Sequence, residues 1–162
     1  MFRKGFTLIE LLVVIAIIAI LALTAVVSIN PLVRFQDSRD SVRWQVANDI
    51  LTAIKLDQVD HGGHYLPAIV GLTSNTVYMI GTDTSGCADF NAHCTTAVSS
   101  GASCVDLSEL ITRGYFGQVP VSPNGAGNWT SGHTGYTLTM AGDSAIVRAC
   151  ENEHSNEIKL MR

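Results

Sequence analysis

The sequence has little positive charge. It contains 10 Lys and Arg residues against 14 Asp and Glu residues, and its formal net charge is −4 at pH 7. A protein that must bind nucleic acid usually presents a basic face to the phosphates. The charge balance therefore argues against obligate nucleic-acid binding.

Signatures of common catalytic sites are missing as well. The chain contains no phosphate-binding glycine loop, no nucleophile elbow and no zinc-protease helix motif. Its scattered Ser, His and Asp residues do not make a triad, because a triad is defined by geometry. We therefore expect neither an enzyme nor a bound cofactor.

Charged residues are absent from residues 11–29, where Thr24 and Ser28 are the only polar side chains. As an α-helix, this stretch is about 28 Å long, which is enough to cross the hydrocarbon core of a bilayer. Arg3 and Lys4 precede it, and a positive flank predicts that the first residues stay in the cytoplasm. The part of the chain that follows the span is then expected to lie outside the cytoplasm.

A secretory signal peptide is one alternative for this segment. Its apolar core is usually about 7–15 residues long, and a small-residue cleavage site should follow. The run here is longer and lacks such a site. A plain membrane anchor fits the length but does not explain Glu10, because an unpaired carboxylate at the mouth of the span is energetically unfavourable. Glu10 is therefore expected to have a function beyond membrane anchoring.

Residues 4–21 read KGFTLIELLVVIAIIAIL. They join a basic leader, a glycine, an aromatic residue, a glutamate four residues after it and an uninterrupted apolar run. This combination resembles the class III signal of type IV pilins and pseudopilins. The resemblance implies a pilin-like subunit that is processed at its N-terminus and held in a filament by its first helix.

The resemblance also implies the processing steps and the partners. A membrane prepilin peptidase is expected to cut between Gly5 and Phe6 on the cytoplasmic side and to methylate the new amine of Phe6. A glycine suits this position, because a residue without Cβ allows close backbone approach. The other expected partners are the lipid bilayer, an inner-membrane assembly platform, and copies of the chain or other pilins.

The cut also gives Glu10 a partner. In a filament, the Glu10 carboxylate of one subunit is expected to meet the Phe6 amine of its neighbour, which offsets the burial of both charges and fixes the axial register. The alternative is that Glu10 lies in the headgroup region without a role. Phe6 and Glu10 are the predicted assembly residues.

A second helical segment is expected after Asn30 and Pro31, where the proline predicts a kink or local melting. Four aliphatic residues then recur at every fourth position: Val42, Val46, Ile50 and Ile54. The stripe is widened by Ala47, Leu51 and Ala53. This pattern predicts an amphipathic helix packed against a sheet. Asp40 and Arg43 are expected to lie largely away from the buried stripe.

The C-terminal part contains short strand patterns. Residues 136–140 and 145–150 predict a hairpin, and residues 76–81 and 157–160 add strands. The expected fold is α+β and pilin-like, with a long N-terminal helix packed on a small antiparallel sheet. The expected division is a cleaved leader (1–5), a transmembrane and assembly helix (6–30), an amphipathic helix of the head (31–61), and a sheet head with a disulfide-bearing loop (62–162).

Four cysteines, Cys87, Cys94, Cys104 and Cys150, lie in the outward part. An even number of cysteines outside the cytosol usually forms disulfides, and three pairings are possible here. We expect Cys87 to pair with Cys94, closing a short polar loop, and Cys104 to pair with Cys150. Zinc binding by Cys87, Cys94 and His93 is the less favoured alternative.

Other polar groups offer weaker alternatives. His61 and His64 could be metal ligands, but the glycines between them favour an exposed turn. Asp83 and Asp89 could hold calcium, but their spacing lacks the EF-hand pattern, so solvation is the expected role. Asn128 begins a glycosylation sequon, a triplet that is common by chance. No metal site is predicted.

The expected function and its two alternatives follow in order of preference. The first is a subunit of a type IV pilus that serves adhesion, twitching motility or DNA uptake, and the second is a pseudopilin of a type II secretion system. The third is a membrane-anchored enzyme or binding module. In the first two cases the chain is a single-pass membrane protein before assembly. Afterwards it lies in an extracellular surface filament, or in the periplasm if it is a pseudopilin.

Overall fold

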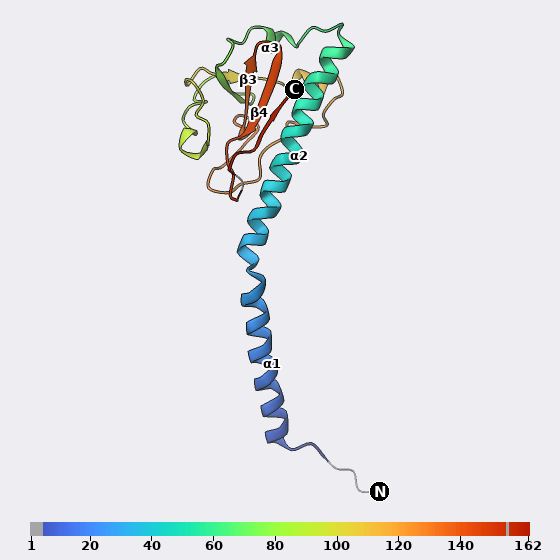
Figure 1. The fold of residues 1–162 in the computed structure, drawn as a ribbon, viewed down its shortest axis with the longest axis vertical. Helices are drawn as coiled ribbons and strands as arrows, with labels where there is room; N and C mark the ends of the chain where they lie inside the picture. Colours follow the sequence, from blue (N-terminus) through green and yellow to red (C-terminus); the bar gives the residue numbers. More distant parts are fainter. Residues whose placement is uncertain (1–4, 155) are drawn as a thin grey trace. The chain divides into compact units, whose positions relative to one another are not determined.

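The computed structural model describes residues 5–154 and 156–162, so the leader residues Arg3 and Lys4 lie outside the described residues. The chain divides into two compact units, Met1–Gln36 and Asp37–Arg162. The first unit holds helix α1 (Leu8–Ile29) and the start of helix α2 (Pro31–Asp60). The second unit, which we call the head, holds the rest of α2 and all of the strands (Figure 1).

A single residue separates the two long helices. Asn30 has φ of 46° and ψ of 70°, which is a left-handed conformation, and Pro31 is the first residue of α2. Proline cannot donate a backbone hydrogen bond, and it disfavours a helical conformation in the residue before it. The predicted interruption at Asn30 and Pro31 is confirmed, and it is confined to one residue.

The buried face of α2 differs from the predicted stripe. The buried residues are Asp40, Arg43, Ala47, Ile50, Leu51, Ala53, Ile54 and Asp57. Five residues of the stripe are therefore predicted correctly: Ala47, Ile50, Leu51, Ala53 and Ile54. Val42, by contrast, is 44% exposed. A four-residue spacing drifts by about 40° per step around a helix of 3.6 residues per turn, so Val42 leaves the face that contains Ile54. The expectation that Asp40 and Arg43 lie away from this face was wrong.

The head contains a five-stranded sheet in the order β2-β1-β3-β4-β5. The strands are β1 (Val77–Ile80), β2 (Cys104–Val105), β3 (Tyr136–Ala141), β4 (Ser144–Ala149) and β5 (Lys159–Met161). The predicted β3–β4 hairpin is confirmed, with Tyr136 opposite Ala149 and Ala141 opposite Ser144. Strand β2 was not predicted, and it pairs with β1 in parallel, whereas the other pairs are antiparallel.

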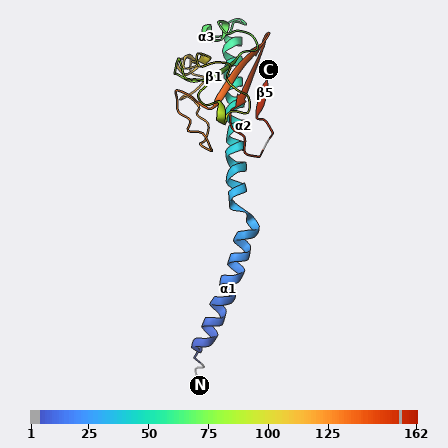
Figure 2. The ribbon, with the colours of Figure 1, turned by 90° about the vertical axis from the view of Figure 1, so that its left-hand side faces the viewer.

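The main core lies between α2 and the sheet. Strands β3 and β4 lie beside α2 in both Figure 1 and Figure 2, and Ile50 and Leu51 of α2 pack in one cluster with Leu138 and Val147 of these strands. Residues on both faces of β3 are buried. A second cluster explains this burial: Met79, Cys87, Val98, Trp129 and Cys150. The head therefore has an α+β fold with an apolar cluster beneath its long loops.

Three short helical turns connect the larger elements: α3 (Pro67–Val70), η1 (Asn91–His93) and α4 (Glu109–Thr112). Helix α2 ends at Asp60 and is followed by a turn with Gly62 and Gly63, whose φ angles are 68° and 93°. The Gly63 N–H donates to the Gln58 carbonyl oxygen at 2.7 Å. Glycine suits this end of the helix, because a left-handed conformation carries no steric penalty in a residue without Cβ.

The structure pairs Cys87 with Cys104 and Cys94 with Cys150. The expected pairing of Cys87 with Cys94 and Cys104 with Cys150 was wrong. Cys104 lies in β2, which pairs beside β1, and the Thr95 N–H donates to the Cys150 carbonyl oxygen at 2.8 Å. These contacts between segments far apart in the sequence decide which cysteines meet. The spacing of the cysteines along the chain does not predict them.

Candidate processing and assembly site

The first helix begins at a capping box. Thr7 is the N-cap of α1, and its Oγ1 accepts a hydrogen bond from the Glu10 N–H at 3.4 Å. In return, Glu10 Oε2 accepts from the Thr7 N–H at 2.8 Å and from the Thr7 hydroxyl at 2.7 Å. This reciprocal arrangement satisfies backbone donors that the helix itself cannot pair. It fixes the start of α1 at Leu8.

The predicted cleavage position lies just outside this helix. Gly5 and Phe6 have no regular secondary structure and are exposed, and the Phe6 side chain is 82% exposed. A Cβ atom added to Gly5 meets no atom within 4 Å. Packing within the described residues therefore does not require a glycine at position 5, and the peptide bond between Gly5 and Phe6 is accessible.

Helix α1 presents its apolar side chains to the surroundings on every side. All side chains of residues 5–28 are exposed. By length and composition, the helical stretch Leu8–Asp60 includes one window that is long and apolar enough to cross a membrane. A continuous apolar surface of this size marks contact with lipid or with other helices.

Glu10 interrupts this apolar surface. It is the only charged residue between Gly5 and Leu32. Ile9, Val13 and Val14 of the helix, and Phe6 just before it, line an open hollow together with Glu10. The carboxylate is therefore displayed within an apolar surface, where a partner of opposite charge can reach it.

The comparison with known families agrees with this geometry. A family model described as the prokaryotic N-terminal methylation motif matches residues 1–26. The chain carries a type IV prepilin signal. The resemblance seen in the sequence is confirmed over these residues. No curated protein and no solved structure matches the chain.

The predicted processing and assembly residues fall within the prepilin signal. Gly5, Phe6 and Glu10 all belong to the matched segment, and the structure brings them together at the start of α1. The cut after Gly5, the methylation of Phe6 and the pairing of Glu10 with a neighbouring Phe6 stay predictions.

A buried ionic cluster in the head was missed by the sequence reasoning. We call it the Arg43 cluster: Arg39, Asp40, Arg43, Glu151 and Glu153. The Arg43 side chain is fully buried, and its NH1 donates to Asp40 Oδ1 at 2.8 Å and to Glu153 Oε1 at 2.9 Å. Its NH2 donates to Glu151 Oε2 at 2.8 Å. Arg39 Nε also donates to Glu153 Oε1, at 2.6 Å.

The Arg43 cluster ties α2 to the connection between β4 and β5. Asp40 accepts hydrogen bonds from the backbone N–H groups of Glu153 and His154, at 3.0 and 2.9 Å. The hydrogen bond from Arg39 lowers the pKa of Glu153 and raises the pKa of Arg39. In the sequence, the only signal of this cluster is that Asp40 and Arg43 lie on the same face of α2 as Ile50 and Ile54.

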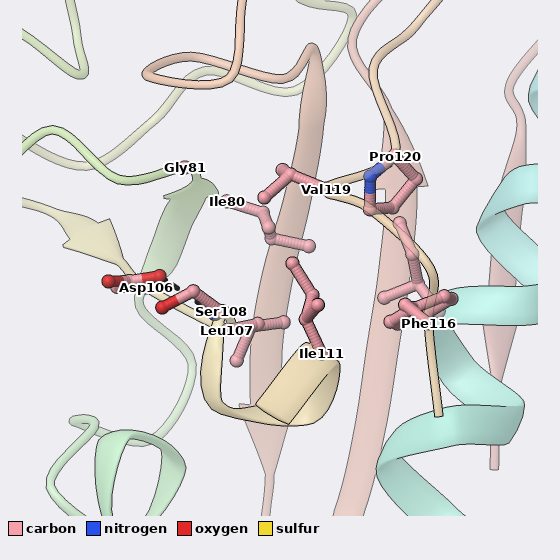
Figure 3. Close-up of a pocket in the computed structure, with 10 residues that line it drawn as sticks. Ile80, Gly81, Asp106, Leu107, Ser108, Ile111, Phe116, Val119 and Pro120 are labelled. Carbon is pink, nitrogen blue, oxygen red and sulfur yellow. Dashed lines mark hydrogen bonds between the residues drawn. The ribbon is translucent and has the colours of Figure 1, made fainter. Parts of the chain in front are cut away.

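The head also contains an apolar pocket between α2, β1 and α4, shown in Figure 3. Ile80, Leu107, Ile111 and Val119 point toward one another in this view, whereas the Asp106 carboxylate lies to one side. The cavity has a volume of about 10 Å³. Pockets that hold small-molecule ligands usually enclose about 300–1,000 Å³, so this one is a packing defect of the core.

The metal-ligand candidates have other partners. Among the described residues, no group of three or more His, Cys, Asp and Glu side chains is arranged to hold a metal ion. His61 Nδ1 lies 2.9 Å from the Asp57 carbonyl oxygen, and Asp83 Oδ2 lies 3.1 Å from His133 Nδ1. Cys87 and Cys94 are both in disulfides, so neither is a thiolate that could bind zinc. Asn128 is exposed in a loop.

Proposed function

We propose that the chain is a structural subunit of a type IV pilus filament, processed by prepilin peptidase and assembled through its N-terminal helix. The prepilin signal at residues 1–26 indicates a processed subunit of the pilin or pseudopilin type, with a structural rather than an enzymatic role. The observation that supports assembly through the N-terminal helix is the apolar surface of α1, whose described side chains are all exposed.

In the proposed filament, the α1 helices of neighbouring subunits cover one another. Each helix then exchanges lipid contacts for packing against other helices, which in apolar surroundings is driven by close van der Waals contact and by interhelical polar pairs. Residues 1–5 are the proposed leader and residues 6–30 the anchor. Residues 31–61 and 62–162 form the part displayed outside the cytoplasm.

Glu10 can take part in this assembly without losing its role at the start of the helix. Both hydrogen bonds that Thr7 donates end on Oε2 of Glu10, and no described residue donates a hydrogen bond to Oε1. The amine that cleavage creates on Phe6 of a neighbouring subunit can therefore bind Oε1 while the capping box stays intact. Such a pair offsets the burial of both charges in apolar surroundings. The two groups meet only when the subunits are in register.

A pseudopilin of a type II secretion system is the alternative. The observation that supports it is the pair Pro120 and Pro123 in the segment after α4, which resembles the proline-rich segment of pseudopilins. The two proposals share the prepilin signal and the anchor. They differ in where the processed subunit accumulates, on the cell surface or in the cell envelope.

The test is the intact mass of the non-reduced protein, measured in filaments sheared from the cell surface and in the remaining membranes. A species that begins at methylated Phe6 in the sheared filaments supports a pilus subunit. The same species confined to the membranes supports a pseudopilin or a minor component. A species that retains residues 1–5 in both fractions contradicts both proposals and favours the anchored enzyme or binding module.

A further inference from the structure

An asparagine followed by a glycine lies next to the Arg43 cluster. Asn124 and Gly125 are exposed in the connection between α4 and β3. In such a pair, the backbone nitrogen of the second residue can attack the side-chain amide carbon of the asparagine and close a five-membered ring. Glycine favours this attack, because it has no Cβ to obstruct it and its backbone is the least restricted.

The local hydrogen bonds favour the same reaction. The Trp129 N–H donates to Asn124 Oδ1 at 3.0 Å. A donor on this oxygen stabilises the negative charge that develops there when the amide carbon is attacked. Within the described residues, the Gly125 N–H donates no hydrogen bond, so no interaction must be broken before it reacts.

We propose that Asn124 deamidates spontaneously in the folded head. The Gly125 nitrogen forms a bond to Cγ of Asn124 and loses its proton, and the side-chain nitrogen leaves as ammonia with that proton. Water then opens the resulting succinimide at either carbonyl, which yields aspartate or isoaspartate. The reaction consumes one water molecule and needs no enzyme, oxidant or cofactor.

The product is coupled to the Arg43 cluster by close packing. A Cβ atom added to Gly125 would lie 2.8 Å from Glu151 Oε2 and 2.9 Å from Arg43 NH2, and the Gly127 N–H donates to Glu151 Oε1. Isoaspartate inserts a methylene into the backbone between Cα of residue 124 and the Gly125 nitrogen, which shifts Gly125 relative to these two side chains. The new carboxylate also adds negative charge beside Glu151 and Glu153. Deamidation should therefore loosen the cluster.

The experiment uses the full processed chain in detergent, held at mildly alkaline pH and sampled over days. Peptide mapping measures aspartate and isoaspartate at each asparagine. Asn128 is the matched control, since it is exposed in the same loop but is followed by Trp129. We expect Asn124 to react at least about tenfold faster than Asn128, which corresponds to a difference of about 1.4 kcal/mol in barrier. Equal rates at the two positions overturn the proposal.

A second measurement tests the coupling to the Arg43 cluster. Asn124→Gln keeps an amide but forms a less favourable six-membered ring, so it should resist the reaction. After the same incubation, the wild-type chain should unfold at a lower urea concentration than before, whereas the variant should keep its midpoint. If the isoaspartate-containing chain unfolds at the original midpoint, the coupling is refuted even where deamidation occurs.

Discussion

Arg43 shows how single residues hold the head together. Two guanidinium groups face three carboxylates in its cluster, and Arg43, Asp40 and Glu151 are all buried. A buried charge is tolerated only while its partners are present, so the loss of one partner leaves the others desolvated and unpaired. Arg43 therefore has a structural role that an exposed arginine on the same helix does not have.

Replacing Arg43 and Arg39 in turn should distinguish the stability contribution of a buried ion pair from that of a more exposed one. We expect Arg43→Met to lower the free energy of unfolding by about 3–5 kcal/mol, because Asp40 and Glu151 lose their main partner in a buried site. Arg39→Met is the matched variant, and it should cost no more than about 1 kcal/mol because its side chain is 32% exposed. Urea denaturation monitored by tryptophan fluorescence measures both values, and equal losses would contradict the assignment.

The contribution of Glu153 to the stability of the fold should depend on pH. Hydrogen bonding to Arg39 lowers its pKa in the folded state below the ordinary value of 4.5. A carboxylate whose pKa is lowered on folding stabilises the fold above its unfolded pKa, and this contribution is lost as the pH falls through the folded pKa. Glu153→Gln should therefore be less stable than wild type at pH 7, and the difference should shrink below pH 4.5. Glu157→Gln, outside the cluster, is the control, and an equal pH effect in both variants would count against this account.

At the scale of elements, the sequence predicts those whose signal is local. The β3–β4 hairpin is carried by alternating residues on either side of Gly142, whose φ of 59° suits a tight turn. Proline at position 31 places the interruption between the long helices in the same way. Strand β2 has only two residues, Cys104 and Val105, and it exists because β1 offers an edge to pair with. No local pattern specifies such a strand.

The disulfides also depend on this non-local arrangement, and their effects on stability should differ. Cys94 and Cys150 are separated by 56 residues, whereas Cys87 and Cys104 are separated by 17. Under the chain-entropy model, the longer loop gives the larger stabilisation, by about 1 kcal/mol. We expect the double serine variant of Cys94 and Cys150 to lose more stability than that of Cys87 and Cys104.

Peptide mapping without reduction checks the pairing directly. Fragments that join Cys94 to Cys150 are expected, with Cys87 and Cys104 joined in a second set. Recovery of fragments that join Cys87 to Cys94 would refute both the pairing and the stability order derived from it.

At the scale of the whole molecule, the prepilin signal could be predicted from sequence because its parts are contiguous. The spacing of Gly5, Phe6 and Glu10 carries it without any tertiary contact. The Arg43 cluster could not be predicted, since Arg43 and Glu151 are 108 residues apart and only the fold brings them together. The wrong placement of Asp40 and Arg43 arose from the assumption that charge on an amphipathic helix faces solvent.

Assembly should distinguish the two roles of Glu10. Glutamine can also close a capping box, but it carries no charge. If charge pairing with the neighbouring Phe6 amine drives assembly, Glu10→Gln and Glu10→Ala should both be cleaved normally and should both reduce filament yield strongly. The measurement is the amount of sheared filament relative to the processed subunit in the membranes. Normal assembly of Glu10→Gln alone would assign the role to the capping box.

The long separation between the partners in the Arg43 cluster also sets when the head can be completed. Arg43 and Asp40 precede their partners Glu151, Glu153 and His154 by 108–114 residues. At roughly 5–20 residues per second, this stretch takes roughly 5–20 s to synthesise. During that interval, Arg43 and Asp40 lack these partners. Closure of the Arg43 cluster therefore waits for residues 151–154, and a nascent chain that stops before Glu151 keeps its signal and anchor but leaves Arg43 without these carboxylates.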